Sequence, residues 1–297
     1  MKKLTNQQKT SLVYFNKKFK EWNIKSNSKN YNVITDRLRT TFRTYKKIRN
    51  QIDFLDIGCG TGQLSIIINN KKNIVSSTGL DYANNMIFQA KKNNRKLKSN
   101  VDFICDSFFN HNFNKKFNLI SAHGFIEYIS QKELIDFFKI LSKITKKNGY
   151  ISIGSRNRLF NIFSSNQFTV MESNEDKKNL INEMIEVNKF TNIENFLKKK
   201  LYKTYKIFKK HPITGVLVKQ RNQFTPFELS KLIEKFNFKI TQIYPVNFHS
   251  IMPSLLNNKI LYRDIYEKNA LNVSNNFQDE FRFLNSSSSF IIEAKKI

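Results

Sequence analysis

The stretch FLDIGCGTGQLSI at residues 54–66 constrains the fold of this chain more than any other part of the sequence. Its three glycines, Gly58, Gly60 and Gly62, stand at every second position between an apolar run and the start of a helical pattern. A glycine-rich turn of this kind lets backbone N–H groups at a helix N-terminus meet an anionic or polar ligand without side chains in the way. The stretch therefore predicts a strand, a ligand-binding turn and a helix, in that order.

Apolar runs and helical patterns alternate on both sides of this turn. The apolar runs predict strands at residues 52–57, 73–81, 101–106, 117–125, 150–155, 239–246 and 289–297. The helical patterns between them predict helices at residues 62–70, 83–97, 130–145 and 225–238. Such alternation is typical of an α/β fold with a parallel, doubly wound sheet, whose ligands bind at the carboxyl ends of the strands.

Two other segments depart from this alternation. Residues 6–50 carry apolar and aromatic side chains three and four positions apart, which predicts N-terminal helices with a polar break at residues 23–32. The stretch that follows the fifth strand is polar and helical, without a clear strand pattern, and we interpret it as an insertion over the strand ends. The expected organisation is an N-terminal helical segment at 1–50, a main domain at 51–155 and 223–297, and an inserted cap or lid at 156–222.

The glycine spacing decides between the known uses of such a turn. A phosphate-binding P-loop needs a lysine directly after its last glycine, and no lysine follows Gly62. A dinucleotide-binding turn places its third glycine three residues after the second, whereas Gly62 follows Gly60 by two. Both alternatives are disfavoured.

The turn closely resembles the first motif of class I S-adenosylmethionine-dependent methyltransferases of the small-molecule type, with Asp56 as the acid before the glycines. Other motifs of that family follow in order. Asp81 ends the second strand, Asp106 and Ser107 end the third, and the segment SAHGFIEYI at 121–129 ends the fourth. The resemblance covers residues 52–155 and the closing strands, and it implies a Rossmann-like sheet of seven strands, mostly parallel with an antiparallel last strand.

The resemblance also implies the cofactor, S-adenosylmethionine, which leaves the reaction as S-adenosylhomocysteine. In the family the acid of the second motif binds both ribose hydroxyls, and the acid of the third motif faces the adenine amino group. The residues implied to hold the cofactor are Asp56, Gly58, Cys59, Gly60, Gly62, Asp81, Tyr82, Met86, Asp106, Ser107 and His123. No metal site is expected, because two cysteines cannot form a four-ligand zinc site by themselves.

Methylation of a hydroxyl calls for a base that takes its proton. His123 ends the fourth strand and is the first candidate, although it can equally hydrogen-bond within the pocket wall. His249 follows the sixth strand and is the second candidate, whereas His111 and His211 read as surface residues.

The acceptor must be recognised by the variable parts of the chain. Arg156, Asn157 and Arg158 directly follow the fifth strand, and arginine suits bidentate recognition of anions, so we expect these residues near the acceptor. They could equally anchor the inserted cap to the sheet. We expect an acceptor that is a small molecule, a lipid precursor or a sugar of a glycan, methylated at oxygen.

Charge leaves a second interpretation open. The chain carries a net charge of +28, which suits nucleic acid or an anionic membrane face. The excess is mostly lysine spread along the whole chain, which favours drift in composition over a built phosphate site. Ribose methylation of RNA therefore remains an alternative, as does a protein that binds the cofactor without turnover. We expect a cytoplasmic protein, because no apolar run is long enough for a transmembrane helix and the first residues do not form a secretory signal.

Overall fold

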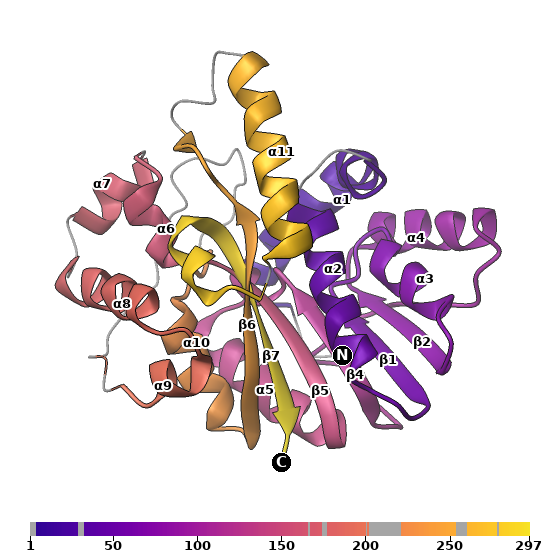
Figure 1. Cartoon of the computed structure of the whole chain (residues 1–297). Helices are drawn as coiled ribbons and strands as arrows, with labels where there is room; N and C mark the ends of the chain where they lie inside the picture. The colour runs from indigo at the N-terminus through magenta and orange to yellow at the C-terminus, as the bar shows by residue number, and fades with distance from the viewer. Residues whose placement is uncertain are drawn as a thin grey trace.

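Seven strands form one sheet in the order β3-β2-β1-β4-β5-β7-β6 at the centre of the molecule (Figure 1). The computed structural model describes residues 4–28, 33–165, 167–173, 177–199, 201, 221–253, 260–277 and 279–297. The strands are β1 (Ile52–Ile57), β2 (Ile74–Asp81), β3 (Asp102–Cys105), β4 (Phe117–His123), β5 (Thr145–Arg156), β6 (Phe238–Phe248) and β7 (Ser287–Lys296). The pairs formed by β1 to β5 are parallel, while β7 is antiparallel to both β5 and β6, so the expected Rossmann-like sheet is confirmed.

The two faces of the sheet are covered by different helices. Side chains alternate across a strand, so Phe54 points to one face of β1 and Leu55 to the other. Phe54 packs with Leu64 of α3 (Gln63–Asn69) and Phe42 of α2 (Val33–Lys46). Leu55 belongs to the larger core beneath α5 (Gln131–Ile144) and α10 (Pro226–Glu234). Helix α4 (Asn84–Lys96) contacts β3.

Helix α5 begins where the sequence predicts. The hydroxyl of Ser130 accepts from the Glu133 N–H at 3.3 Å, and the Ser130 N–H donates to the Glu133 carboxylate at 2.7 Å. This reciprocal pair satisfies two N–H groups of the first turn that have no partner within the helix. The hydroxyl of Thr225 similarly accepts from the Glu228 N–H at the start of α10. These caps fix the starting points of two helices that cover the larger core.

The segment after β5 lies beside β6 and β7 (Figure 1). Its helices are α6 (Arg158–Phe163), α7 (Gln167–Ser173), α8 (Lys177–Lys189) and α9 (Ile193–Leu197). Leu180, Val187 and Phe196 of this segment are fully buried and belong to the larger core. A helix that the sequence analysis did not predict, α11 (Ile260–Asn276), stands between β6 and β7 along the chain. No helix in the described ranges has the length and apolar character needed to cross a membrane.

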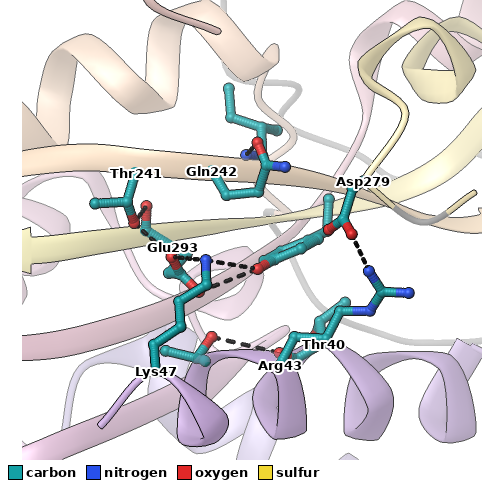
Figure 2. A network of polar contacts seen from close by, with 10 residues as sticks. Thr40, Arg43, Lys47, Thr241, Gln242, Asp279 and Glu293 are labelled. Atoms are coloured by element: carbon teal, nitrogen blue, oxygen red, sulfur yellow. Dashed lines mark hydrogen bonds and ion pairs between the residues drawn. The ribbon is translucent and has the colours of Figure 1, made fainter. Parts of the chain in front are cut away.

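Helix α2 is fastened to the sheet by a buried carboxylate (Figure 2). Glu293 of β7 is fully buried, and it accepts from Lys47 Nζ at 2.7 Å, from Tyr244 Oη at 3.1 Å and from Thr241 Oγ1. Lys47 directly follows α2, and Arg43 one turn earlier pairs with Asp279. A buried carboxylate is tolerated only when it is paired and hydrogen-bonded, so this network fixes the C-terminal end of α2 over β7 and β6.

We expect Lys47→Met to lower the free energy of unfolding by about 1–2 kcal/mol near neutral pH, because it removes the only cation bonded to Glu293 among the described residues. Urea denaturation followed by circular dichroism measures the change. Lys46→Met is the matched control, since Lys46 is an exposed neighbour. Equal losses in the two variants would show that the network contributes nothing.

Candidate functional site

A cavity lies at the carboxyl ends of the first four strands, where the sequence analysis expects the ligand. Each strand brings one titratable residue to its wall or its edge: Asp56 from β1, Asp81 from β2, Asp106 just after β3, and His123 from β4. Phe15 and Trp22 of α1 (Asn6–Ser26) line the same cavity. Helix α1 therefore covers the strand ends.

The glycine turn opens toward this cavity. Gly60 and Gly62 have φ angles of +55° and +87°, which favour glycine. A Cβ at Gly62 would lie 2.5 Å from the ring of Phe103, so a side chain there would collide with the core. A Cβ at Gly60 would meet no protein atom within 4 Å, and Gly60 lines the cavity. The two glycines thus have different roles, since Gly62 permits close packing against the core and Gly60 leaves room for a ligand.

Asp81 joins the turn to the end of β2. Its carboxylate accepts from the Gly60 N–H at 3.0 Å and from the Ala83 N–H at 2.9 Å. Burial raises the pKa of Asp81 to about 6, although these N–H bonds oppose the shift. The carboxylate lines the cavity and is ionised at neutral pH, so it can accept hydrogen bonds from the hydroxyls of a ligand.

Asp56 supports the turn from below. Its two carboxylate oxygens accept from Ser121 Oγ at 2.6 Å and from Ser65 Oγ at 2.9 Å, and the residue is 4% exposed. Burial raises its pKa to about 6. Because both oxygens bind side chains of β4 and α3, Asp56 holds these elements together at the cavity floor.

The remaining residues implied to contact the cofactor also reach the cavity. The set formed by Gly58, Cys59, Tyr82, Met86 and Ser107 lines it together with Asp106. His111 is partly exposed and makes a 3.0 Å contact from Nδ1 to the Asp106 carboxylate. Burial raises the pKa of the Cys59 thiol well above its usual value, so Cys59 stays a neutral thiol rather than a nucleophile.

His123 is held on the floor of the cavity. Its Nε2 lies 3.0 Å from Ser152 Oγ of β5 and 3.3 Å from Thr41 Oγ1 of α2. Burial, followed by the charge of Arg37, lowers the pKa of His123 to about 3. The ring is therefore neutral at physiological pH, and Nδ1 is the ring atom that remains to meet a ligand.

Other predicted acceptor contacts lie elsewhere. The Asn157 amide donates to the carbonyls of Leu284 and Ser287, and Arg158 forms a buried double hydrogen bond to Glu172. Both residues are thus committed to folding the segment after β5.

His249 and Arg156 are also absent from the cavity lining. His249 packs between the rings of Phe160 and Tyr266, with centroids 4.6 and 5.1 Å away. Arg156 lies over the ring of Phe168, at 5.5 Å. Of the described residues in 156–222, Arg221 is the one that reaches the cavity.

A charged group on the β4 side of the cavity was missed by the sequence analysis. Glu127, in the 3₁₀ turn η1 (Ile126–Tyr128), accepts from Arg221 at 2.7 and 2.9 Å and from Arg37 at 3.4 Å. Tyr128 lines the cavity beside them. Glu127 and Tyr128 lie in the 121–129 segment that ends the fourth strand, whereas Arg37 comes from α2 and Arg221 from the stretch before α10, and no motif links these three parts of the sequence.

Helix α1 is fastened across the cavity by polar side chains. At one end Gln7 donates to the Tyr128 carbonyl at 3.2 Å. Near its middle Asn16 accepts from the Asn85 N–H, and farther along Asn23 accepts from Asn93 at 2.8 Å. The helix therefore bridges η1 and α4, on opposite sides of the glycine turn.

These residues fit S-adenosylmethionine. The Asp81 carboxylate can accept from ribose hydroxyls, and the open space at Gly60 admits a ligand close to the backbone. Tyr82 and Met86 offer apolar surface to a base. The buried Nε of Arg37, which has no hydrogen-bond partner among the described residues, offers a cation to the carboxylate of the methionine part.

Comparison with known proteins agrees with this geometry. Residues 48–209, more than half of the chain, match the family model described as a methyltransferase domain. Malonyl-[acyl-carrier protein] O-methyltransferase of Acetivibrio thermocellus is 26% identical over 119 residues, which are 38% of this chain and 41% of that protein. The match thus spans about two fifths of the length of that relative.

Solved structures resemble the whole fold. Magnesium protoporphyrin IX methyltransferase from Synechocystis PCC 6803 with bound SAH has a TM-score of 0.57 at 11% identity, covering 98% of this chain and 100% of that one. An N-methyltransferase from Bradyrhizobium japonicum WM9, in complex with S-adenosyl-L-homocysteine, has a TM-score of 0.55 at 9% identity, covering 98% and 99%. The shared fold is one that holds this cofactor.

We expect the affinity for S-adenosylhomocysteine to fall about tenfold between pH 7.5 and pH 5, because the pKa of Asp81 is about 6 and its protonation removes an acceptor for the ribose hydroxyls. Isothermal titration calorimetry at several pH values measures this. Asp81→Asn should bind more weakly at pH 7.5 and lose most of the pH dependence. If the affinity of Asp81→Asn still falls about tenfold between pH 7.5 and pH 5, the titrating group is another one, such as Asp56.

Proposed function

Since the chain belongs to the family of methyltransferase domains and uses S-adenosylmethionine, we propose that it methylates an oxygen atom of a small-molecule acceptor bound beside His123, Glu127 and Tyr128. The cofactor supplies an activated methyl group, carried on a sulfonium. The tasks left to the protein are to bind both molecules, align the acceptor oxygen and keep water out. Alignment of this kind contributes several kcal/mol to lowering a reaction barrier.

One observation carries the proposal for a small acceptor. The cavity extends from Asp81 to Tyr128 under α1, and the aromatic side chains of Phe15, Trp22 and Phe125 line it. Phe15 lies edge-on to Tyr128, with ring centroids 5.0 Å apart. A covered, aromatic-lined cavity suits a compact molecule, whereas a polymer strand needs an open groove with cations along it.

The choice of oxygen rests on one relative and on the charges of the cavity wall. The curated relative is named as an O-methyltransferase, and its similarity covers part of each chain. The charged residues around Glu127 favour an acceptor with polar oxygen groups over an apolar carbon centre.

His123 contributes to the acceptor site as a neutral hydrogen-bonding group. A general base works best when its pKa lies near the working pH, and burial holds the pKa of His123 at about 3. Its bonds to Ser152 and Thr41 fix the ring, so Nδ1 can orient an acceptor. His249 has no contact with the cavity and is not part of this arrangement.

We expect purified protein to transfer labelled methyl from S-adenosylmethionine to the small-molecule fraction of an extract of the cells that produce it. The extract is separated after the reaction into nuclease-sensitive polymer, lipid, glycan and small-molecule fractions, and the label in each is counted. Label confined to nuclease-sensitive polymer would replace the proposal with RNA methylation. Asp81→Asn is the control for transfer that depends on cofactor binding.

We also expect His123→Ala to lower turnover about tenfold, because the acceptor loses an orienting contact. His249→Ala should stay within about twofold of the wild type, since its ring lies outside the cavity. Initial rates with the labelled cofactor at saturating extract measure both variants, and thermal melting verifies that they fold. A loss of turnover well above twofold in His249→Ala would contradict the proposal and place the acceptor site near Phe160.

A further inference from the structure

The outer face of helix α1 combines cations with aliphatic side chains. Its residues recur at spacings of three and four, so their side chains lie on one side of the helix; they are Lys9, Val13, Lys17, Lys20 and Ile24. All five are exposed, and Val13 and Ile24 are 69% and 70% exposed. Drift of the composition toward lysine would raise the number of cations, but it would not place aliphatic side chains among them.

The same helix buries polar side chains, namely Gln7, Gln8 and Ser11. A helix on the surface of a protein normally turns its apolar side chains inward and its polar ones outward. One exposed apolar side chain is common and needs no explanation. A helix that buries amides and exposes aliphatic groups at regular spacing is instead suited to a partner on its outer face.

Helix α4 lies beside α1 (Figure 1). The Asn85 N–H donates to Asn16 at 3.0 Å, and Asn93 donates to Asn23 at 2.8 Å, so the two helices run in the same direction. Lys20 follows Asn16 by four positions and therefore lies toward the side of α1 that meets α4. The outer face of α1 thus adjoins α4.

The adjoining face of α4 has a similar composition. Lys92 and Lys96 follow Asn85 by seven and eleven positions, which places them toward the side that meets α1. Phe88 lies one turn before Lys92 and is 63% exposed, and Arg95 is exposed beside them. We call these exposed residues of α1 and α4 the basic face.

Acidic side chains offset little of the charge of the basic face. Helix α1 contains one acid, Glu21, which binds Lys18 Nζ at 2.6 Å, and α4 contains none. Cations that gather on one surface attract anions from solution and repel one another. An anionic partner therefore complements this surface.

We propose that the basic face binds the surface of a lipid bilayer that contains anionic phospholipids. Val13, Ile24 and Phe88 enter the headgroup region, where their apolar surface leaves water. The lysine ammonium groups contact the lipid phosphates, and each adds to the attraction of the protein to the anionic surface. This inference goes beyond the proposed function and does not depend on the identity of the methyl acceptor.

An anionic bilayer fits this composition better than RNA. RNA-binding surfaces stack bases on aromatic rings, and arginine matches a phosphate with paired N–H groups. Val13 and Ile24 offer no ring for stacking, and lysines outnumber arginine on the basic face. Lysine suits lipid because its hydrocarbon stem packs along apolar groups while its ammonium reaches the phosphates.

Docking at the basic face brings the cavity close to the bilayer. Phe15 and Trp22 line the cavity, and each stands two positions before a residue of the outer face, Lys17 and Ile24. Residues two positions apart point to nearly opposite sides of a helix. The docked protein therefore holds its cavity directly behind the helix that touches lipid.

Co-sedimentation with vesicles tests the proposal. The protein is mixed with vesicles of phosphatidylcholine alone, or with about 30% phosphatidylserine added, at about 0.15 M salt. We expect binding to the anionic vesicles to be about tenfold tighter or more. Protein that stays in the supernatant with both kinds of vesicle would overturn the proposal. Because no methyl acceptor takes part, that failure would leave the proposed function untouched.

Lysine variants separate the basic face from the net charge of the chain. The triple variant Lys17→Gln, Lys20→Gln and Lys92→Gln should bind anionic vesicles about tenfold more weakly. The matched control replaces three exposed lysines of α5 and β5 by glutamine, namely Lys139, Lys143 and Lys147. It loses the same charge and should stay within about threefold of the wild type. Equal losses in the two triple variants would overturn the assignment to this face.

Apolar variants test the entry of side chains into the headgroup region. The double variant Val13→Gln and Ile24→Gln keeps the net charge, and glutamine is a good helix former, so α1 should stay intact. We expect it to bind anionic vesicles about fivefold more weakly, because less apolar surface leaves water. Val75→Gln with Ile297→Gln is the matched control, since both residues are exposed elsewhere. Equal binding by the two double variants would contradict the proposal.

A single-stranded RNA oligonucleotide tests the other polyanion. Fluorescence anisotropy measures its binding to the wild type and to both triple lysine variants. We expect the two triple variants to bind RNA equally. RNA binding that is lost only without Lys17, Lys20 and Lys92, with no difference between the two kinds of vesicle, would assign the basic face to nucleic acid. In every variant, an affinity for S-adenosylhomocysteine within about twofold of the wild type shows that the protein is folded.

Discussion

The site depends on the carboxylate of Asp81, which binds the backbone of two segments at once. Its bonds to the Gly60 and Ala83 N–H groups tie the glycine turn to the end of β2, next to the start of α4. Asp56 joins β4 to α3 from below by accepting from two serine hydroxyls. Asp81 and Asp56 each hold together the elements to which they bind. The shape of the cofactor cavity therefore depends on how the strand ends are connected.

The second half of the cavity depends on α2. The network around Glu293 fastens the end of this helix to the sheet, and the helix then carries Thr41 and Arg37 to the cavity, where they meet His123 and Glu127. The side that holds the cofactor is thus built from consecutive strand ends. The side that we propose for the acceptor is assembled from parts that lie far apart in sequence.

This division explains what could be predicted from the sequence. The strands and Asp81 follow from local patterns, since a residue at the end of a parallel strand must lie at the ligand edge of the sheet. Arg37 and Arg221 carry no such signal, because their place depends on how α2 and the stretch before α10 pack. Arg158 follows a strand end, but α6 starts there and its side chain turns into the fold to meet Glu172.

The weak attachment of helix α1 has a consequence for how ligands reach the covered cavity. It crosses the cavity, yet Gln7, Gln8 and Ser11 are the residues it buries, so its attachment rests largely on polar contacts. Each such hydrogen bond contributes only about 0.5–1.5 kcal/mol, because water replaces it when it breaks. The covering helix is therefore the part of the wall that separates at least cost, and a ligand that exchanges beneath it leaves the sheet undisturbed.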